Sequence, residues 1–292
     1  MLGIAILATH EDVVTVLQNI PGITWKAKVY DNMFSYSTKP IQKLQFTQPA
    51  NTSADTTDPL PDHWDWTQKR PDCMNVVSNI GMCSVSGLVS SANIISDMRC
   101  LKNLDQPRVE YSAQFMLNCD TQYKAPLCDD MPVQPNGWTF LIDNGTVPES
   151  CVSYQSGKTG KTGKCPVKCD DQSKLPNRTH IKSVLFICNF NDPENEQRIM
   201  RALINGPVQT RIQVTQDLNY YESGIYQYEY GAWVGWTYCE FVGYGEENGV
   251  KFWKVKNERG TDWGENGFFR IIRGTKPGGE NDIESECYQA VV

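Results

Sequence analysis

The sequence predicts an α+β fold in which the first half is helical and the second half consists mostly of β-strands. Within residues 84–100, Leu88, Ala92 and Ile95 recur at helical spacing. Residues 208–272 are rich in Val, Ile, Tyr and Trp, and glycine-containing turns divide them into strand-length runs. The chain has 292 residues, which is long enough for one large domain or two ordinary ones.

The first predicted helix lies close to the N-terminus. Thr9 is a suitable N-cap, and Glu11 and Asp12 follow it at the positive end of the helix dipole. Residues 13–20 then supply an apolar stripe, and a Pro-Gly pair ends the helix. The apolar segment before it, within residues 1–9, is interpreted as a short signal peptide.

A polar stretch separates this leader from the main body of the chain. Residues 49–59 are polar and rich in helix- and strand-breaking residues and offer no apolar pattern for burial, so we interpret them as a linker. The body opens near Leu60. Its main helix is expected to begin close to Ser86, and its strand pattern begins at Gly206, where Pro and Val follow.

Composition excludes several classes of function. The net charge is -7 and no basic run with interleaved aromatic residues is present, so nucleic acid is not an expected partner. No segment approaches the roughly 20 apolar residues of a membrane span. Eleven cysteines without zinc-type spacing indicate disulfides, an oxidising compartment and at least one free thiol. Sequons at Asn51, Asn144 and Asn177 are compatible with the secretory route.

Residues 79–87, Asn-Ile-Gly-Met-Cys-Ser-Val-Ser-Gly, resemble the signature Gln-Gly-x-Cys-Gly-Ser-Cys-Trp of the papain family of cysteine peptidases. Further stretches resemble the later motifs of that family, at 206–208, 221–226, 243–249, 253–257 and 260–271. The resemblance implies a papain-like two-lobed fold over residues 60–292. It places a helical lobe at about 60–175, a β-barrel-like lobe at about 176–292, and a short prosegment with its linker at 10–59.

Within that family the chain is most similar to the cathepsin B subgroup. The motif from Cys165 to Cys169 and the segment 283–286 match this subgroup, and the leader carries Trp-Lys-Ala at 25–27 as short cathepsin B prosegments do. An occluding loop with two adjacent histidines has no counterpart after Cys151. The resemblance therefore does not imply exopeptidase action.

The resemblance also implies a disulfide pattern. The implied pairs are Cys73 with Cys100, Cys83 with Cys128, Cys119 with Cys165, and Cys151 with Cys169. It leaves Cys188, Cys239 and Cys287 unassigned.

The catalytic positions implied by the resemblance carry residues that do not suit the chemistry. A papain-type mechanism needs a thiolate beside an imidazolium, an orienting amide and an oxyanion donor. The nucleophile position holds Ser86, which we interpret as a structural helix N-cap. The base position holds Thr237, the oxyanion position holds Ile80, and only the orienting Asn257 is retained.

Other parts of the implied substrate cleft are also altered. Arg259 replaces the Trp that shields the catalytic pair, and residues 128–132, Cys-Asp-Asp-Met-Pro, replace the Cys-Asn-Gly-Gly loop that binds extended substrate. Glu286 is retained in the side-chain specificity pocket, so Glu286 and Arg259 are predicted substrate-binding residues. The three histidines, at 10, 63 and 180, lie outside any site motif and are expected to be structural or surface residues.

These substitutions predict an inactive peptidase homologue that binds peptides, its own prosegment or protease inhibitors in a papain-like cleft. Two alternatives stay open at this point, namely a residual endopeptidase that uses Ser86 with another base, and a structural or assembly protein. We expect no cofactor and no metal, and we expect the protein to be a monomer. The expected location is the secretory pathway, with a lysosome-like vacuole or the extracellular space as the end point.

Overall fold

The computed structural model describes residues 9–31, 59–120, 137–189 and 192–292. The segment interpreted as a signal peptide, most of the linker and the altered loop at 128–132 lie outside these ranges. Among the described residues, no helix combines the length and apolar character needed to cross a membrane.

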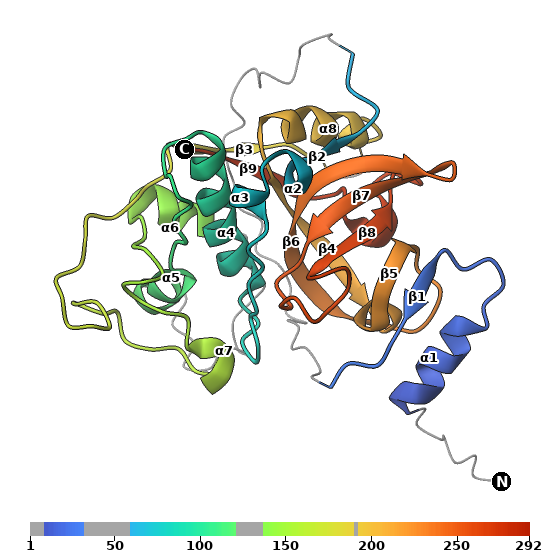
Figure 1. The fold of residues 1–292 in the computed structure, drawn as a ribbon, viewed down its shortest axis with the longest axis horizontal. Helices are drawn as coiled ribbons and strands as arrows, with labels where there is room; N and C mark the ends of the chain where they lie inside the picture. Colours follow the sequence, from blue (N-terminus) through green and yellow to red (C-terminus); the bar gives the residue numbers. More distant parts are fainter. Residues whose placement is uncertain (1–8, 32–58, 121–136, 190–191) are drawn as a thin grey trace.

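The leader forms one helix and one strand. Helix α1 (His10–Gln18) begins as predicted, because the Thr9 side chain accepts a hydrogen bond from the backbone of Asp12 and the Asp12 carboxylate accepts one from the backbone of Thr9. Strand β1 (Trp25–Ala27) pairs with the edge of the sheet. Figure 1 shows both elements at one end of the sheet, away from the other helices.

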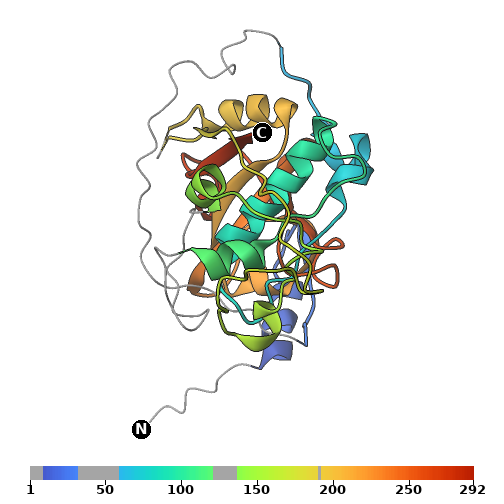
Figure 2. The same cartoon turned by 90° about the vertical axis from the view of Figure 1, so that its left-hand side faces the viewer.

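The helices of the body come first in the chain, as predicted. They are α2 (Trp66–Lys69), α3 (Pro71–Met74), α4 (Ser86–Leu101), α5 (Ala113–Cys119), α6 (Gly137–Asp143) and α7 (Ser156–Thr159). Helix α4 is buried on nearly every side, as expected for a helix enclosed between two lobes. Figure 1 shows α4 between the helices α5 and α6 and the sheet, and Figure 2 shows the helical side in front of the sheet. The helices α4 to α7 are called the helical lobe below.

The β-strands form the second lobe. They are β2 (Trp64–Asp65), β3 (Ser183–Phe186), β4 (Val208–Thr215), β5 (Tyr221–Tyr226), β6 (Trp233–Glu247), β7 (Val250–Lys256), β8 (Phe268–Ile272) and β9 (Cys287–Val291). Their order is β1-β5-β8-β7-β6-β4-β9-β3, with β2 paired to β6. Only the β5–β8 pairing is parallel among the described pairs.

Helix α8 (Asn195–Asn205) packs Ile199 and Leu203 into the core of this sheet lobe. It ends at Gly206, whose φ is 150°. A Cβ on this residue would lie 2.1 Å from the sulfur of Met98, which belongs to α4. The Gly-Pro-Val motif therefore marks a close approach between α8 and α4 that only glycine permits.

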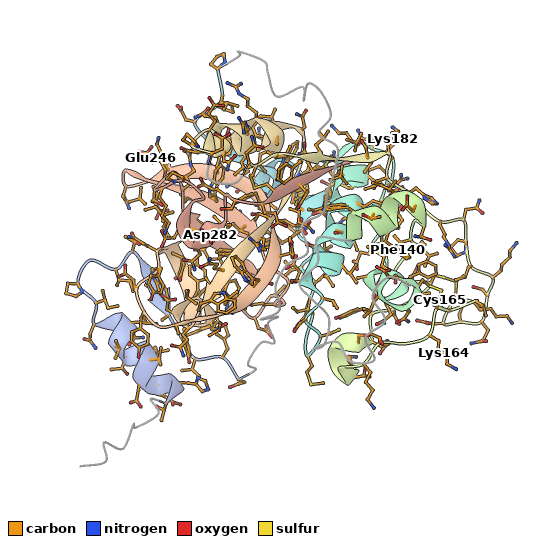
Figure 3. All side chains as sticks on the ribbon, turned by 180° about the vertical axis from the view of Figure 1, so that it is seen from behind. Phe140, Lys164, Cys165, Lys182, Glu246 and Asp282 are labelled. Atoms are coloured by element: carbon orange, nitrogen blue, oxygen red, sulfur yellow. A yellow bond between two sulfur atoms is a disulfide. The ribbon has the colours of Figure 1, made fainter. Side chains whose placement is uncertain are left out.

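Each lobe has its own hydrophobic core. The core of the sheet lobe includes large side chains such as Phe241 and Trp253, and the core of the helical lobe includes Phe115 and Trp138. Figure 3 shows Phe140 and Cys165 on the helical side and Glu246 and Asp282 on the sheet side. The observed fold thus matches the predicted division into a helical part and a β-rich part.

The described disulfides agree with the implied pattern and extend it. The structure contains Cys73–Cys100, Cys119–Cys165 and Cys151–Cys169. Cys83 is disulfide-bonded, and its implied partner Cys128 lies outside the described residues. Cys188 pairs with Cys287, which the sequence left unassigned, and Cys239 is a free buried thiol.

Candidate functional site

Ser86 lies where α4 meets the sheet, at the position implied for a nucleophile. The helix begins at Ser86, but its N-cap residue is Val85, which has no side-chain cap. The Ser86 hydroxyl instead accepts a hydrogen bond of 2.9 Å from the backbone N–H of Tyr238 on β6. The interpretation of Ser86 as an N-cap is therefore wrong, because its side chain turns away from the helix end to join the two lobes.

Thr237, the position implied for the base, is next to Tyr238 in β6 and opposite Ile212 in β4. It is 4% exposed, and its hydroxyl donates a weak hydrogen bond of 3.4 Å to the Tyr238 carbonyl. Thr237 therefore immediately precedes the residue whose N–H binds Ser86. A threonine hydroxyl cannot accept and return a proton near neutral pH, so the pair lacks a general base.

Ile80 lies in the loop before α4. Its side chain is buried, and its backbone N–H donates to the carbonyl of Glu258 at 3.0 Å. The loop is held in place by Gly81, which has a φ of 57° and packs so closely on Gly157 that a Cβ would lie 2.3 Å from its carbonyl oxygen. Neither the side chain nor the N–H of Ile80 is available to an oxyanion.

Asn257 follows β7 and is buried, with its side-chain oxygen accepting from the N–H of Glu258 at 3.0 Å. Its amide therefore serves the local backbone. Arg259 pairs with Asn79 in an isolated bridge and lies 4.8 Å from the centre of the Trp263 ring. Both residues are thus placed by packing and hydrogen bonding within the loops around the junction.

The histidines of the chain have partners elsewhere in the structure. His10 shares a hydrogen bond of 2.6 Å with the hydroxyl of Tyr220, and His180 shares one with the Ile142 carbonyl. His63 packs beside Gly245, at the far end of β6. All three histidines of the chain are described, and each lies outside the junction between Ser86 and Thr237.

Cys239 cannot take the part of the nucleophile. It is fully buried, and burial, together with the neighbouring Glu258 and Glu240, raises the pKa of its thiol well above the ordinary value. A thiol needs a lowered pKa to be a good nucleophile near neutral pH. The other described cysteines are in disulfides.

A buried cluster of charged residues joins α4 to the sheet behind the site. Lys256 of β7 contacts Asp97 of α4 and lies 3.3 Å from Glu240 of β6, and Arg108 donates to Asp97 at 2.8 Å. Burial raises the pKa of Glu240 to about 8 and that of Glu258 well above its usual range. Nothing in the sequence marked this cluster, because its members are far apart in the chain.

Glu286 is connected to Ser86 through Tyr238, which contacts both residues. The hydroxyls of Tyr238 and Tyr288 donate to one carboxylate oxygen at 2.8 and 3.2 Å. The Nε of Arg211 lies 3.4 Å from the other oxygen. The retained acid is therefore already surrounded by partners from this chain, which the sequence did not predict.

The leader borders a cavity of about 770 Å³ on the other side of this junction. Its lining residues are Lys28, Val29, Tyr30, Asp31, Asn79, Gly81, Met82, Gly157, Arg259, Asp262 and Trp263. The Tyr30 hydroxyl donates to the Tyr221 carbonyl at 2.6 Å and accepts from the N–H of Gly264 at 2.8 Å. The leader thus lines this cavity together with the loop before α4 and the loop after β7.

One group of side chains among the described residues has metal-ligand spacing, namely Asp72, Cys73 and Cys100. Both sulfurs are joined in a disulfide, so neither can act as a thiolate ligand. The charged cluster behind the site has both signs of charge and is held by its own ion pairs. Neither group resembles a metal centre.

Comparisons with known proteins agree with this geometry. A family model described as papain family cysteine protease matches residues 60–291. Cathepsin B-like CP3 of Giardia intestinalis is 40% identical over 217 residues, which cover 74% of this chain and 70% of that protein. Cathepsin B-like CP2 of the same organism is 37% identical over 250 residues, with 85% and 79% covered.

A solved structure of procathepsin B S9 from Trypanosoma congolense has a similar fold. The TM-score is 0.82 and the sequence identity 26%, over 97% of this chain and 98% of that one. The similarity extends over nearly the whole chain, so it includes the leader as well as the body.

Proposed function

Because the chain belongs to the papain family of cysteine proteases and is a cathepsin B-like homologue, we propose that it keeps the fold of this family without its peptidase chemistry. The proposal rests above all on one observation. Ser86, at the implied nucleophile position, is buried, and its hydroxyl accepts a hydrogen bond from the N–H of Tyr238. The residue before Tyr238 in β6, at the implied base position, is Thr237.

The expected rate supports the same proposal. Removing the nucleophile or base of a serine protease lowers kcat by about 10^6, and removing one oxyanion donor lowers it by roughly 10^2 to 10^3. The losses overlap rather than multiply, yet what remains after all of them would be little above background hydrolysis. Ser86, Thr237 and Ile80 do not suit the tasks of nucleophile, base and oxyanion donor. A single inactivating change would affect only one of these tasks.

We further propose that the leader is the resident occupant of the cleft. Strand β1 pairs with β5, and Trp25 is 4% exposed, with its indole N–H donating to the Gln227 carbonyl at 3.0 Å. A tethered segment has an effective concentration in the millimolar range, which exceeds that of most free peptides. Peptides or protease inhibitors would then bind after another protease has cut the linker.

The disulfides and the family relationship indicate a secretory or lysosomal type of compartment. We propose the lumen of an acidic vacuole or the extracellular space as the place of action. Both contain proteases that could cut the linker in trans.

The proposal is tested by assaying the purified chain with fluorogenic peptide reporters and with epoxide and vinyl-sulfone probes. We expect no hydrolysis above that of Ser86→Ala and no probe attached at residue 86. Mass spectrometry of copurifying peptides would at the same time look for a bound ligand. Hydrolysis that disappears in Ser86→Ala would overturn the proposal and favour a residual endopeptidase.

A further inference from the structure

The side chains that surround Glu286 include an arginine of the same chain. Strands β4 and β6 place Arg211 directly opposite Tyr238, with Trp236 two residues further along the same face. Glu286 immediately precedes β9, which pairs with β4 beside Arg211. Three neighbouring strands therefore bring these four side chains together next to Ser86.

The contacts of Arg211 are those expected of a bound guanidinium ligand. Its guanidinium carbon lies 3.8 Å from the centre of the Trp236 ring, within the range of a cation–π contact. Its Nε lies 3.4 Å from the Glu286 carboxylate, an ion pair without the alignment of a hydrogen bond. Its side chain is 9% exposed, and Nε and Nη1 have no hydrogen-bond partner among the described residues.

The acid of this cluster already faces a cation of the same chain. One oxygen of Glu286 accepts the hydroxyls of Tyr238 and Tyr288, and the other faces Arg211. A guanidinium arriving from outside would have to displace Arg211 from both the carboxylate and the ring of Trp236. The paired charges also remove the net negative potential that would attract a basic side chain.

We propose that these side chains form a guanidinium-binding pocket which Arg211 fills in cis, so that the cleft rejects ligands that would place an arginine or lysine there. This inference deepens the proposed function and rests on it, because it treats the cleft as a binding surface. The ligands compatible with the filled pocket are peptides with a small side chain at this position.

The proposal is tested by removing the internal arginine and supplying a free one. Arg211→Ala leaves Glu286, Trp236 and the two tyrosines in place, and we expect methylguanidinium to raise its melting temperature saturably. The wild-type chain should show no such rise, because its pocket is full. Methylammonium, which has the charge but cannot stack as a plane, should bind Arg211→Ala less tightly.

Two further variants show whether methylguanidinium raises the melting temperature by binding in the pocket. Combining Arg211→Ala with Glu286→Gln should lower the affinity for methylguanidinium about tenfold or more, because a charge-assisted contact is lost. Arg198→Ala, which removes an arginine from a surface ion pair, should gain no methylguanidinium binding. Equal melting-temperature rises in wild type, Arg198→Ala and Arg211→Ala would overturn the proposal.

A measurement on the wild-type chain makes the test independent of how well the variants fold. Butanedione modifies accessible arginines, and mass spectrometry reports the rate at each residue. We expect Arg211 to react at least tenfold more slowly than the exposed Arg178, and Trp236→Ala to raise its rate. Equal rates at Arg211 and Arg178 in the wild-type chain would mean that Arg211 does not fill a pocket.

The two proposals fail in different ways. An active wild-type peptidase that still protects Arg211 from butanedione would overturn the proposed function and leave the filled pocket intact. An inactive chain with a reactive Arg211 and no rescue by methylguanidinium would overturn only the filled pocket.

Discussion

The surface that holds the leader and the junction around Ser86 differ in which features of the family they retain. The leader surface is complete. Trp25 packs 5.2 Å from Tyr226, and Gly224 lets β1 approach so closely that a Cβ would lie 2.5 Å from the Thr24 carbonyl oxygen. The junction keeps its shape, but the proposed loss of nucleophile, base and oxyanion donor leaves it without chemistry.

This difference follows from how each region works. Docking of the leader depends on apolar area and backbone hydrogen bonds, which many side chains share. Catalysis depends on a few groups at fixed positions, so its loss requires few changes and leaves the fold intact. A protein that retains the first and lacks the second is suited to binding rather than cleavage.

The largest effect is expected when the chemistry is restored. Ser86→Cys alone should stay inactive, because a thiol without an imidazole forms little thiolate. Adding Thr237→His and Ile80→Gln should raise peptide hydrolysis at least about 100-fold above Ser86→Cys, since general acid–base catalysis contributes about 10^2 to 10^4. Reporter hydrolysis and self-removal of the leader at acidic pH are the measurements.

The matched control for this experiment replaces Thr237→His by Thr237→Ala in the triple variant. It should be as inactive as Ser86→Cys. Full activity of Ser86→Cys alone would show that Thr237 is not the base position.

A smaller effect is expected at the leader surface. Trp25→Ala removes a buried indole, and such truncations destabilise by about 3–5 kcal/mol. Amide hydrogens of α1 should then exchange at least about 100-fold faster, which hydrogen-exchange mass spectrometry can follow. Val16→Ala, at a side chain that is 47% exposed on the same helix, should change the rate little. Unchanged exchange in Trp25→Ala would contradict docking through this residue.

The smallest effect is expected in the pH dependence of the free energy of unfolding, which arises from the charged cluster and not from the leader surface. The folded chain holds a proton on Glu240 up to a pKa of about 8, whereas the unfolded chain releases it near 4.5. The free energy of unfolding should therefore fall as pH rises from about 5 to 8, by an amount on the order of 2–4 kcal/mol. Glu258, and Glu149 with a pKa raised by burial to about 7, act in the same direction.

Urea unfolding at pH 5 and pH 8 measures this dependence. Glu240→Gln should weaken it, leaving the part due to Glu258 and Glu149, and Glu246→Gln, at an exposed position of the same strand, should leave it unchanged. A free energy of unfolding that is equal at pH 5 and pH 8 in the wild-type chain would contradict the prediction.

Local signals in the sequence predicted the elements well. Thr9 with Asp12 identified the start of α1, and the spacing of Leu88 and Ala92 placed the start of α4 at Ser86. These signals act over one or two turns, where capping geometry and helical periodicity decide the structure. The implied disulfides came instead from the family resemblance, which carries information about distant pairs.

The contacts of the site residues could not be predicted in the same way. The partner of Ser86 is 152 residues away in the sequence, and Arg211 is 75 residues from Glu286. Which side chains meet at such distances depends on strand register and on the packing of the two lobes. A helix-cap propensity for serine was therefore a poor guide at Ser86, where a tertiary hydrogen bond decides the orientation of the side chain.

The distribution of cysteines gives the two parts of the chain different responses to a cut. Cys188–Cys287 joins two positions with a sequence separation of 99, and the stretch between them includes β4 to β8. If a protease nicks a loop within this stretch, the fragments remain one covalent molecule. No cysteine precedes Cys73, so nothing of that kind retains the leader once the linker is severed. In a protease-rich fluid, the same digestion would therefore shed the leader while the nicked body stays in one piece.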